Sequence, residues 1–254
     1  YQTLGEDAHP LPFSNHGTVY RNGALRCDGT PLGDGEVTYS NSQTSTIPDH
    51  QYVDGFCTVC GGIQPDYLQE ADGFYQISNA QQLSWFSQAV SVFGNTNWNA
   101  RLTANIDLSG FEDKFTPIGN STHPYVGTFD GQFHTISNLF VEQENDYVGF
   151  FGLLNGGATI MNLVLDETCY VKGNIGVGLV GASKVAGTVL LKNLGMEGYV
   201  EAITKNAGGI LGANTGSASS IVMENCYVTG LVSGNNECGS ISGWLGSNGA
   251  KVTN

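Results

Sequence analysis

Basic residues are scarce in this sequence. Only nine lysines and arginines stand against 23 aspartates and glutamates in 254 residues, which gives a formal net charge of −14. Nucleic acids and anionic membrane surfaces require a cationic protein surface, so neither is an expected partner. The sequence also has no apolar run near the ~18 residues that a membrane-spanning helix needs, so no direct membrane span is expected. Cations, proteins and neutral glycans are the partners that this composition allows.

Charged residues of both signs together make up only 13% of the chain, whereas glycine occurs 36 times. Low charge with many glycines and β-branched residues is typical of short strands joined by tight turns. It is poorly suited to a helical bundle. At this length we expect one all-β domain with a small appendage.

One segment departs from the β-rich pattern. The side chain of Asn79 can cap a helix, and apolar residues follow it at helical spacing from Leu83 to Phe93. Gly94 then supplies the residue type that commonly follows a helix C-terminus. These features predict a helix over about 79–93.

From about residue 100 the chain repeats a six-residue frame. Asparagine is the third residue of the frame, apolar residues occupy the first, fourth and sixth positions, and the second and fifth positions vary. The frame centres on Asn105, Asn138, Asn162, Asn193 and Asn225, and the copy at Asn105 is degenerate. Because side chains alternate faces along a strand, both apolar pairs can point inward only if the chain bends at the asparagine. Amides at equivalent corners of stacked coils, about 4.8 Å apart, can hydrogen-bond in a ladder.

This frame predicts a right-handed parallel β-helix, or solenoid, of about six coils over residues 67–254. The helix at 79–93 would cap its N-terminal end, where an open coil exposes unpaired backbone.

A second signal recurs in phase with the first. Short apolar segments lie between glycines at 149–152, 178–181, 209–212 and 239–243, and the last one contains an apparent inserted residue. The GLVG and GILG copies at 178–181 and 209–212 match the GLUG motif, in which U is any hydrophobic residue. Residues 125–139, YVGTFDGQFHTISNL, are similar to a YxGTFDGxGHTIxNL segment that leads such repeats, with Phe133 where glycine is usual.

Residues 74–254 therefore resemble the GLUG-motif repeat surface proteins of gut Bacteroidetes. Many of these are described as adhesins, and the repeats also occur in IgA-peptidase-like proteins. The resemblance implies a secreted or cell-surface location and no particular ligand. We expect a non-catalytic adhesion module that presents an elongated acidic surface to a host protein or glycan. The alternatives are a glycan-active β-helical hydrolase or lyase and a passive stalk of a larger surface protein.

Residues 1–66 form a separate Cys/His module without a hydrophobic period. Cys57 and Cys60 lie in a CxxC turn, with His50 upstream and Cys27 further back. Three thiolates and an imidazole are a ligand set for tetrahedral zinc. In a module with so few apolar residues, a metal would supply much of the folding energy. We expect these four residues to bind structural zinc.

Other interpretations of the module remain open at this point. Cys27 could form a disulfide with either member of the CxxC pair, the pair could be a disulfide by itself, or all three could be free thiols. His9 and His16 are weaker candidates for the fourth zinc ligand. The string HQYVDGFCTVCG, which contains three of the ligands, also resembles a short Cys/His element of gut bacterial surface proteins.

One carboxylate pattern accompanies the repeats. Glu142, Asp166 and Glu197 each follow a repeat asparagine by four residues, so we expect them in an outward-facing column. A calcium site or an acid pair for glycoside cleavage is one interpretation, and a solvated acidic stripe is the one we favour. The sequence contains no recognisable catalytic motif, so an enzyme is not expected, and it does not specify an oligomeric state.

Overall fold

The computed structural model describes residues 20–22, 25–30, 38–40, 46–111, 115–184, 187–216, 219–246 and 250–253. The chain divides into two units, Tyr1–Pro65 and Asp66–Asn254, one residue from the boundary expected from sequence. His9 and His16 lie outside the described residues.

The described part of the first unit contains two short antiparallel strand pairs, the second of which is a tight hairpin. In the first, β1 (Tyr20–Asn22) pairs antiparallel with β2 (Thr38–Ser40), and in the second, β3 (Tyr52–Val53) pairs antiparallel with β4 (Phe56–Cys57). Asp54 and Gly55 join β3 to β4 with φ angles of 51° and 82°. Two left-handed residues in a two-residue loop match the right-handed twist of a hairpin. Cys57 is the last residue of this hairpin.

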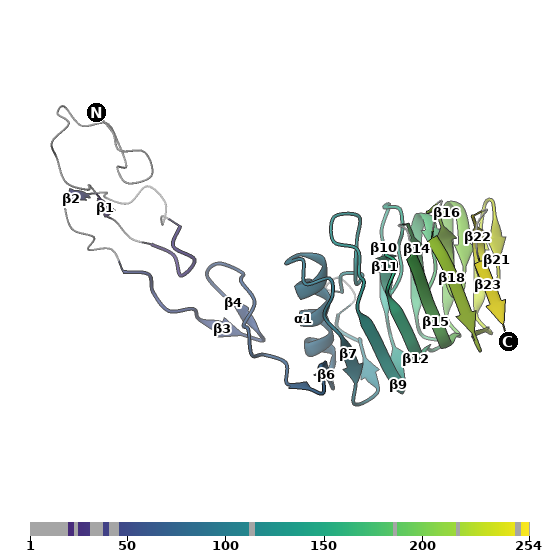
Figure 1. Ribbon diagram of the computed structural model, residues 1–254, viewed down its shortest axis with the longest axis horizontal. Helices are drawn as coiled ribbons and strands as arrows, with labels where there is room; N and C mark the ends of the chain where they lie inside the picture. The colour runs from purple at the N-terminus through teal and green to yellow at the C-terminus, as the bar shows by residue number, and fades with distance from the viewer. Residues whose placement is uncertain are drawn as a thin grey trace, which may run out of the picture. The chain divides into compact units, whose positions relative to one another are not determined.

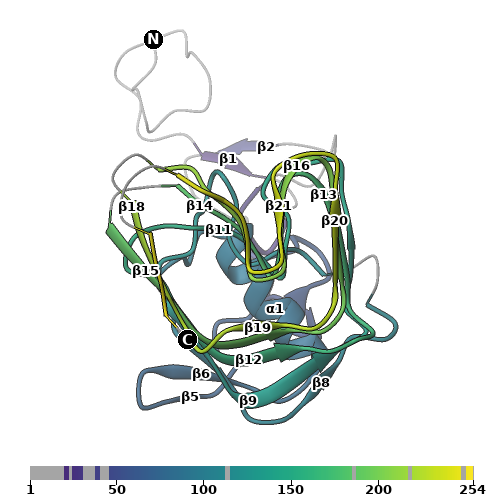
Figure 2. The same ribbon diagram turned by 90° about the vertical axis from the view of Figure 1, so that its right-hand side faces the viewer.

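The second unit is a right-handed parallel β-helix (Figures 1 and 2). One sheet contains β10 (Phe140–Glu142), β13 (Tyr170–Val177), β16 (Tyr199–Gly208), β20 (Leu231–Gly234) and β21 (Cys238–Gly239). A second contains β11 (Phe151–Leu154), β14 (Val180–Ser183), β17 (Leu211–Asn214) and β22 (Ser242–Leu245). The third contains β5 (Glu70–Ala71), β6 (Phe74–Ile77), β7 (Ala100–Leu102), β8 (Ile106–Asp107), β9 (Thr128–Ser137), β12 (Thr159–Leu165), β15 (Gly187–Met196), β18 (Ser219–Glu224), β19 (Tyr227–Val228) and β23 (Ala250–Thr253).

The solenoid has about four turns, because each of the first two sheets stacks four strands in its hydrogen-bonded path. The expected number of about six coils was too high. Strands β6 and β7 add to the third sheet without corresponding strands in the first two sheets. The chain between them forms α1 (Ala80–Ser91) instead of strands for the other two sheets.

Helix α1 covers the N-terminal opening of the coil (Figure 2). The side chain of Asn79 accepts a hydrogen bond from Gln82 N, and Val92 is the C-cap, so the helix expected at 79–93 is confirmed with slightly shorter ends. The fully buried Phe86 ring lies 6.1 Å from the ring of Phe129 in the third sheet. Ser91 Oγ donates to Pro117 O at 2.8 Å. The helix therefore shields the apolar core of the first turn from water.

The asparagine ladder exists in the last three turns. Asn193 Nδ2 donates to Asn162 Oδ1 at 2.7 Å, and Asn225 Nδ2 donates to Asn193 Oδ1 at 3.1 Å. All three residues have φ angles between 52° and 56°, so the chain bends there as the frame predicted. Asp130 begins the column by accepting from Asn162 Nδ2 at 2.9 Å.

Asn105 and Asn138 lie outside this column, and their assignment to it was wrong. Ile136 pairs with Leu165, which places Asn138 beyond the end of β12 rather than opposite Asn162. Asn138 Nδ2 donates instead to Asp107 Oδ1 at 2.8 Å, and Asn105 Oδ1 accepts from Thr135 N at 3.1 Å. Asn138 precedes Asn162 by 24 residues, whereas Asn162 precedes Asn193 by a full turn of 31. A spacing of 24 is too short to return the chain to the same corner.

The glycine-bounded segments lie where the ribbon turns inward between β13 and β14 (Figure 2). The pairing of the second sheet stacks Gly152, Gly181, Gly212 and Gly243. A Cβ at Gly212 would lie 2.2 Å from Val177 N, so a side chain has no room there. The final segment aligns as Ser240–Gly243 with Gly209–Gly212, because Gly239 pairs with Gly208 and Ser242 with Leu211. This copy therefore contains no inserted residue, and the expectation of one was wrong.

The ladder can be tested at its middle member. Asn193→Ala removes two side-chain hydrogen bonds and places an alanine at φ 52°, so we expect a loss of about 3 kcal/mol in the free energy of unfolding. Asn193→Gly tolerates the backbone angle and is expected to lose about 1 kcal/mol less. Urea unfolding followed by circular dichroism measures both. A loss below about 0.5 kcal/mol for alanine would show that the ladder does not stabilise the fold.

Candidate metal centre

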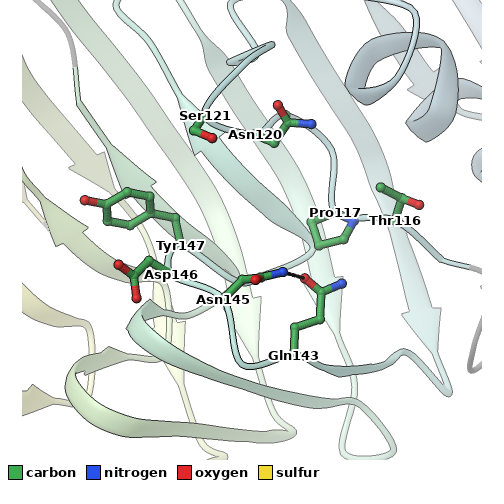
Figure 3. Close-up of a pocket in the computed structure, with 9 residues that line it drawn as sticks. Thr116, Pro117, Asn120, Ser121, Gln143, Asn145, Asp146 and Tyr147 are labelled. Carbon is green, nitrogen blue, oxygen red and sulfur yellow. Dashed lines mark hydrogen bonds between the residues drawn. The ribbon is translucent and has the colours of Figure 1, made fainter.

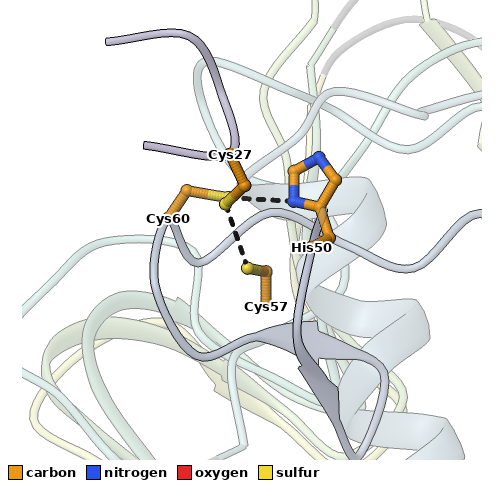
Figure 4. A group of neighbouring side chains, drawn as sticks. All are labelled: Cys27, His50, Cys57 and Cys60. Atoms are coloured by element: carbon orange, nitrogen blue, oxygen red, sulfur yellow. Dashed lines mark hydrogen bonds between the residues drawn. The ribbon is translucent and has the colours of Figure 1, made fainter. Parts of the chain in front are cut away.

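Four side chains from three parts of the first unit converge on one point (Figure 4). The ligand atoms of Cys27, His50, Cys57 and Cys60 all lie within 4.8 Å of one another. Cys27 Sγ lies 3.4 Å from Cys57 Sγ, and Cys60 Sγ lies 3.5 Å from His50 Nδ1. Ligand atoms bound to one tetrahedral zinc at 2.0–2.3 Å are themselves separated by about 3.3–3.8 Å. The group could therefore bind a metal such as zinc.

The CxxC turn positions two of the sulfurs. Cys57 N donates to Gly62 O at 2.8 Å, and Gly61 N donates to Cys57 O at 2.9 Å, which closes the turn. Gly61 adopts φ 74°, an angle that favours glycine. Gly62 N points at Cys60 Sγ at 3.4 Å, as expected of a backbone amide that stabilises a thiolate.

The other two ligands have their own supports. Cys27 is held in a tight turn, in which Arg26 N donates to Thr30 O at 2.8 Å and the Asp28 carboxylate accepts from Thr30 N at 2.9 Å. The imidazole of His50 stacks on the Tyr52 ring with 5.3 Å between ring centres, which fixes its orientation. Each ligand is therefore placed by contacts outside the cluster.

The thiols of the cluster differ in acidity. Hydrogen bonding from the backbone at Cys60 is the main cause that lowers the pKa of the Cys57 thiol to about 5, with further hydrogen bonds from Val59, His50 and Cys27. Burial raises the pKa of the Cys27 thiol to about 12, and its hydrogen bond to Cys57 acts in the same direction. Burial and the neighbouring sulfurs disfavour the Cys27 thiolate, so a metal that binds Cys27 must displace its proton, and metal affinity is expected to rise with pH.

All six cysteines are free thiols in this structure. The 3.4 Å between the sulfurs of Cys27 and Cys57 is well beyond the ~2.05 Å of a disulfide bond. The geometry of the cluster is that of a ligand set.

Cysteine reactivity offers a test of the burial pattern. Burial raises the pKa of the Cys169 thiol to about 12, whereas Cys238 is exposed. We expect iodoacetamide at pH 8 to label Cys238 in the folded protein much faster than Cys169, because the thiolate is the nucleophile. Peptide mass spectrometry measures both rates, and urea should remove the difference. Equal rates in the folded protein would contradict the position given for Cys169.

The expected column of Glu142, Asp166 and Glu197 does not form as a unit. Asp166 and Glu197 do follow paired residues, Leu165 and Met196, on the third sheet. Glu142 lies on a different sheet opposite Lys172, and its Oε1 is 3.0 Å from Lys172 Nζ. The assignment of Glu142 to this column was wrong because its position was counted from Asn138, which is out of register with Asn162.

The three carboxylates all have partners within the protein. Lys172 Nζ bridges Glu142 to Glu201 Oε1, at 3.8 Å. Asp166 Oδ1 accepts from Thr168 N at 3.0 Å, and Glu197 Oε1 accepts from Tyr227 Oη at 2.7 Å. Within the described residues, the metal-compatible grouping of histidine, cysteine and carboxylate side chains is the Cys/His cluster.

Two further columns were not anticipated from the sequence. The rings of Phe140, Tyr170 and Tyr199 stack along the first sheet with centre separations of 5.2 and 5.4 Å. One residue per turn also adopts a positive φ where the chain turns inward, at Tyr147, Gly176, Asn206 and Glu237. These four residue types share no chemistry, so no sequence pattern marks the corner. The aromatic column does have a signal, since its members recur 29 or 30 residues apart.

Sequence comparisons find a distant relative of this chain. No family model matches the chain. Over 155 residues, 57% of this chain, it is 32% identical to halomucin from Haloquadratum walsbyi. The chain is distantly similar to halomucin. The matched part is only 2% of the length of halomucin.

A solved structure shares the fold. It comes from Bacteroides ovatus and is described as a "putative immunoglobulin A1 protease". The two superpose with a TM-score of 0.51 and 23% identity over 70% of this chain and 63% of the other. The chain thus spans less than two thirds of either relative. Within its described residues, no helix is long and apolar enough to cross a membrane.

Proposed function

We propose that this chain is a non-catalytic adhesion module of a secreted or cell-surface protein. Its solenoid would present an elongated acidic face to a host protein or glycan. The main support is the repeating outer surface, in which side chains recur once per turn along the stack. The similarity to a small part of a much longer halomucin supports a role as one segment of a large protein. The net charge of −14 favours neutral or basic partners.

The pairing of the Glu142, Asp166 and Glu197 carboxylates supports the non-catalytic part of this proposal. Glycoside cleavage by the common mechanisms needs two carboxyl groups that flank the scissile bond. Here Glu142 is paired with Lys172, while Asp166 and Glu197 accept hydrogen bonds from neighbouring side chains. Each of the three carboxylates therefore already has a partner within the protein.

We also propose that the Cys/His cluster binds zinc in a structural role. Three sulfurs and one imidazole nitrogen fill a tetrahedral shell, which leaves no position for a substrate. Bound metal would tie the Cys27 turn, His50 and the β3–β4 hairpin together.

A bead assay tests the adhesion proposal. Beads coated with the whole chain are expected to adhere to immobilised host glycoproteins, and the soluble chain should compete. Beads coated with an unrelated acidic protein of similar size provide the control for charge. Adhesion no stronger than that of the control beads would favour the passive stalk and overturn the proposal.

A further inference from the structure

A polar pocket opens at the first turn of the solenoid (Figure 3). Its volume is about 650 Å³, within the range of pockets that hold small ligands. One wall is the loop of residues 116–121, and the other is the segment from Gln143 to Tyr147. Both are backbone segments anchored to neighbouring strands, since Gly152 N donates to Ile118 O and Tyr147 N to Ile175 O. The pocket is therefore part of the framework of the solenoid.

The lining has a specific chemical character. It offers the hydroxyl of Ser121, the amides of Gln143 and Asn145, and the carboxylate of Asp146, and it contains no lysine or arginine. Asn145 Nδ2 lies 3.4 Å from Gln143 Oε1, and Asp146 Oδ1 accepts from Asn174 Nδ2 at 2.8 Å. Among the described residues, these contacts leave Gln143 Nε2, Asn145 Oδ1 and Asp146 Oδ2 without a protein partner. The pocket thus has both donors and acceptors to offer a ligand.

Tyr147 adds a rigid aromatic wall. It adopts φ 62° at the inward corner, and it packs against the buried side chains of Leu153, Ala182 and Ala213. A Cβ on Gly176 in the next turn would lie 3.0 Å from its Cδ1, so the ring is closely supported from that side. In the corner column, the later turns have Gly176, Asn206 and Glu237 at this place. The combination of ring and amides therefore occurs in the first turn alone among these four corners.

We propose that this pocket binds a neutral saccharide. Sugar hydroxyls both donate and accept hydrogen bonds, which suits amides beside a single carboxylate, and the apolar face of a sugar ring suits an aromatic wall. Asp146 would repel sulfated or sialylated sugars. Lys184 Nζ lies 5.9 Å from the centre of the Tyr147 ring, so the charged sugars of the array also test whether this cation offsets that repulsion. Calcium would find only one carboxylate, and its sites commonly draw on several oxygen ligands. This inference rests on the proposed adhesion function and names the ligand class for it.

Binding of the whole chain to an array of neutral, sialylated and sulfated oligosaccharides is the first step of the test. Isothermal titration calorimetry then measures the affinity of the preferred neutral glycan for wild type and for three variants, Asp146→Asn, Gln143→Ala and Glu144→Gln. The last variant removes the exposed carboxylate of Glu144, which lies between Gln143 and Asn145 in the sequence but does not line the pocket. We expect wild type to prefer neutral glycans. Asp146→Asn and Gln143→Ala should each weaken binding about tenfold or more, while Glu144→Gln stays within about twofold.

Circular dichroism confirms that each variant is folded, and Asp146→Asn preserves the shape of the side chain. Neutral glycan binding that survives both pocket variants would overturn the pocket and leave the adhesion proposal intact. Preference for charged glycans, or calcium binding without sugar binding, would overturn the ligand class. If no oligosaccharide binds, this inference fails, whereas adhesion to protein is judged separately by the bead assay.

Discussion

Replacing Cys57 or Cys60 with serine is expected to abolish metal binding by the first unit. Wild type should contain about one zinc per chain, and either variant close to none, because a hydroxyl is a poor zinc ligand beside two remaining thiolates. Structural zinc contributes on the order of 10 kcal/mol to small domains. The segment from Cys27 to Cys60 should therefore become protease-sensitive in either variant. Elemental analysis and limited proteolysis measure these two effects.

Cys238→Ser is the matched control, since this thiol is exposed and lies outside the cluster. It should retain full zinc content. The solenoid of the Cys57 and Cys60 variants should keep its β-rich circular dichroism spectrum, because the two units have separate cores. Wild-type protein without metal, with two thiols lost to a disulfide by mass, would contradict the zinc site.

Substituting Gly212 with alanine is expected to destabilise the solenoid by about 3 kcal/mol or more. The added Cβ would lie 2.2 Å from Val177 N and 2.4 Å from the carbonyl carbon of Gly176. Both are backbone atoms of the preceding turn, so no side-chain rotation relieves the clash. Urea unfolding followed by tryptophan fluorescence measures the loss.

Gly110→Ala separates this steric effect from backbone strain. Gly110 has φ 82°, and a Cβ there would meet nothing within 4 Å. It should lose only the ~1–2 kcal/mol of a left-handed alanine. Equal losses at the two sites would contradict the close packing at the inward corner.

The helix and the parallel β-helix could be predicted because both depend on local periodicity. The capping oxygen of Asn79 and the apolar spacing after it identify α1. The Asn162–Asn193–Asn225 register followed from repeats of 31 and 32 residues, which match one full turn. Similarly, three cysteines and one histidine, two of them in a CxxC turn, were enough to nominate the Cys/His cluster.

The errors at Asn138 and Glu142 have a common physical cause. Asn138 matches the local frame but lies only part of a turn before Asn162. The local frame does not show which residue of the neighbouring turn lies opposite a given asparagine. Asp130 pairs with Met161 and accepts the hydrogen bond from Asn162, and the residues after Asp130 bulge, with Gln132 and Phe133 at φ 51° and 62°. Phe133 is 74% exposed at an angle that favours glycine, which explains the glycine usual in similar segments.

The pocket was also beyond prediction from sequence. Its two walls are separated by about 25 residues and meet only because the chain winds most of one turn between them. Polar residues such as Gln143 and Asn145 are common in loops, so nothing in the sequence distinguishes them from solvent-exposed residues.

We propose that this solenoid binds glycans and glycoproteins without cleaving them. The most direct test incubates the whole chain with the glycans and glycoproteins that it retains and quantifies new reducing and unsaturated sugar ends by mass spectrometry. We expect the bound glycans to be recovered intact at every concentration of the chain. Release of new ends in proportion to the chain, lost on replacing Asp166 or Glu197 with the corresponding amide, would contradict it.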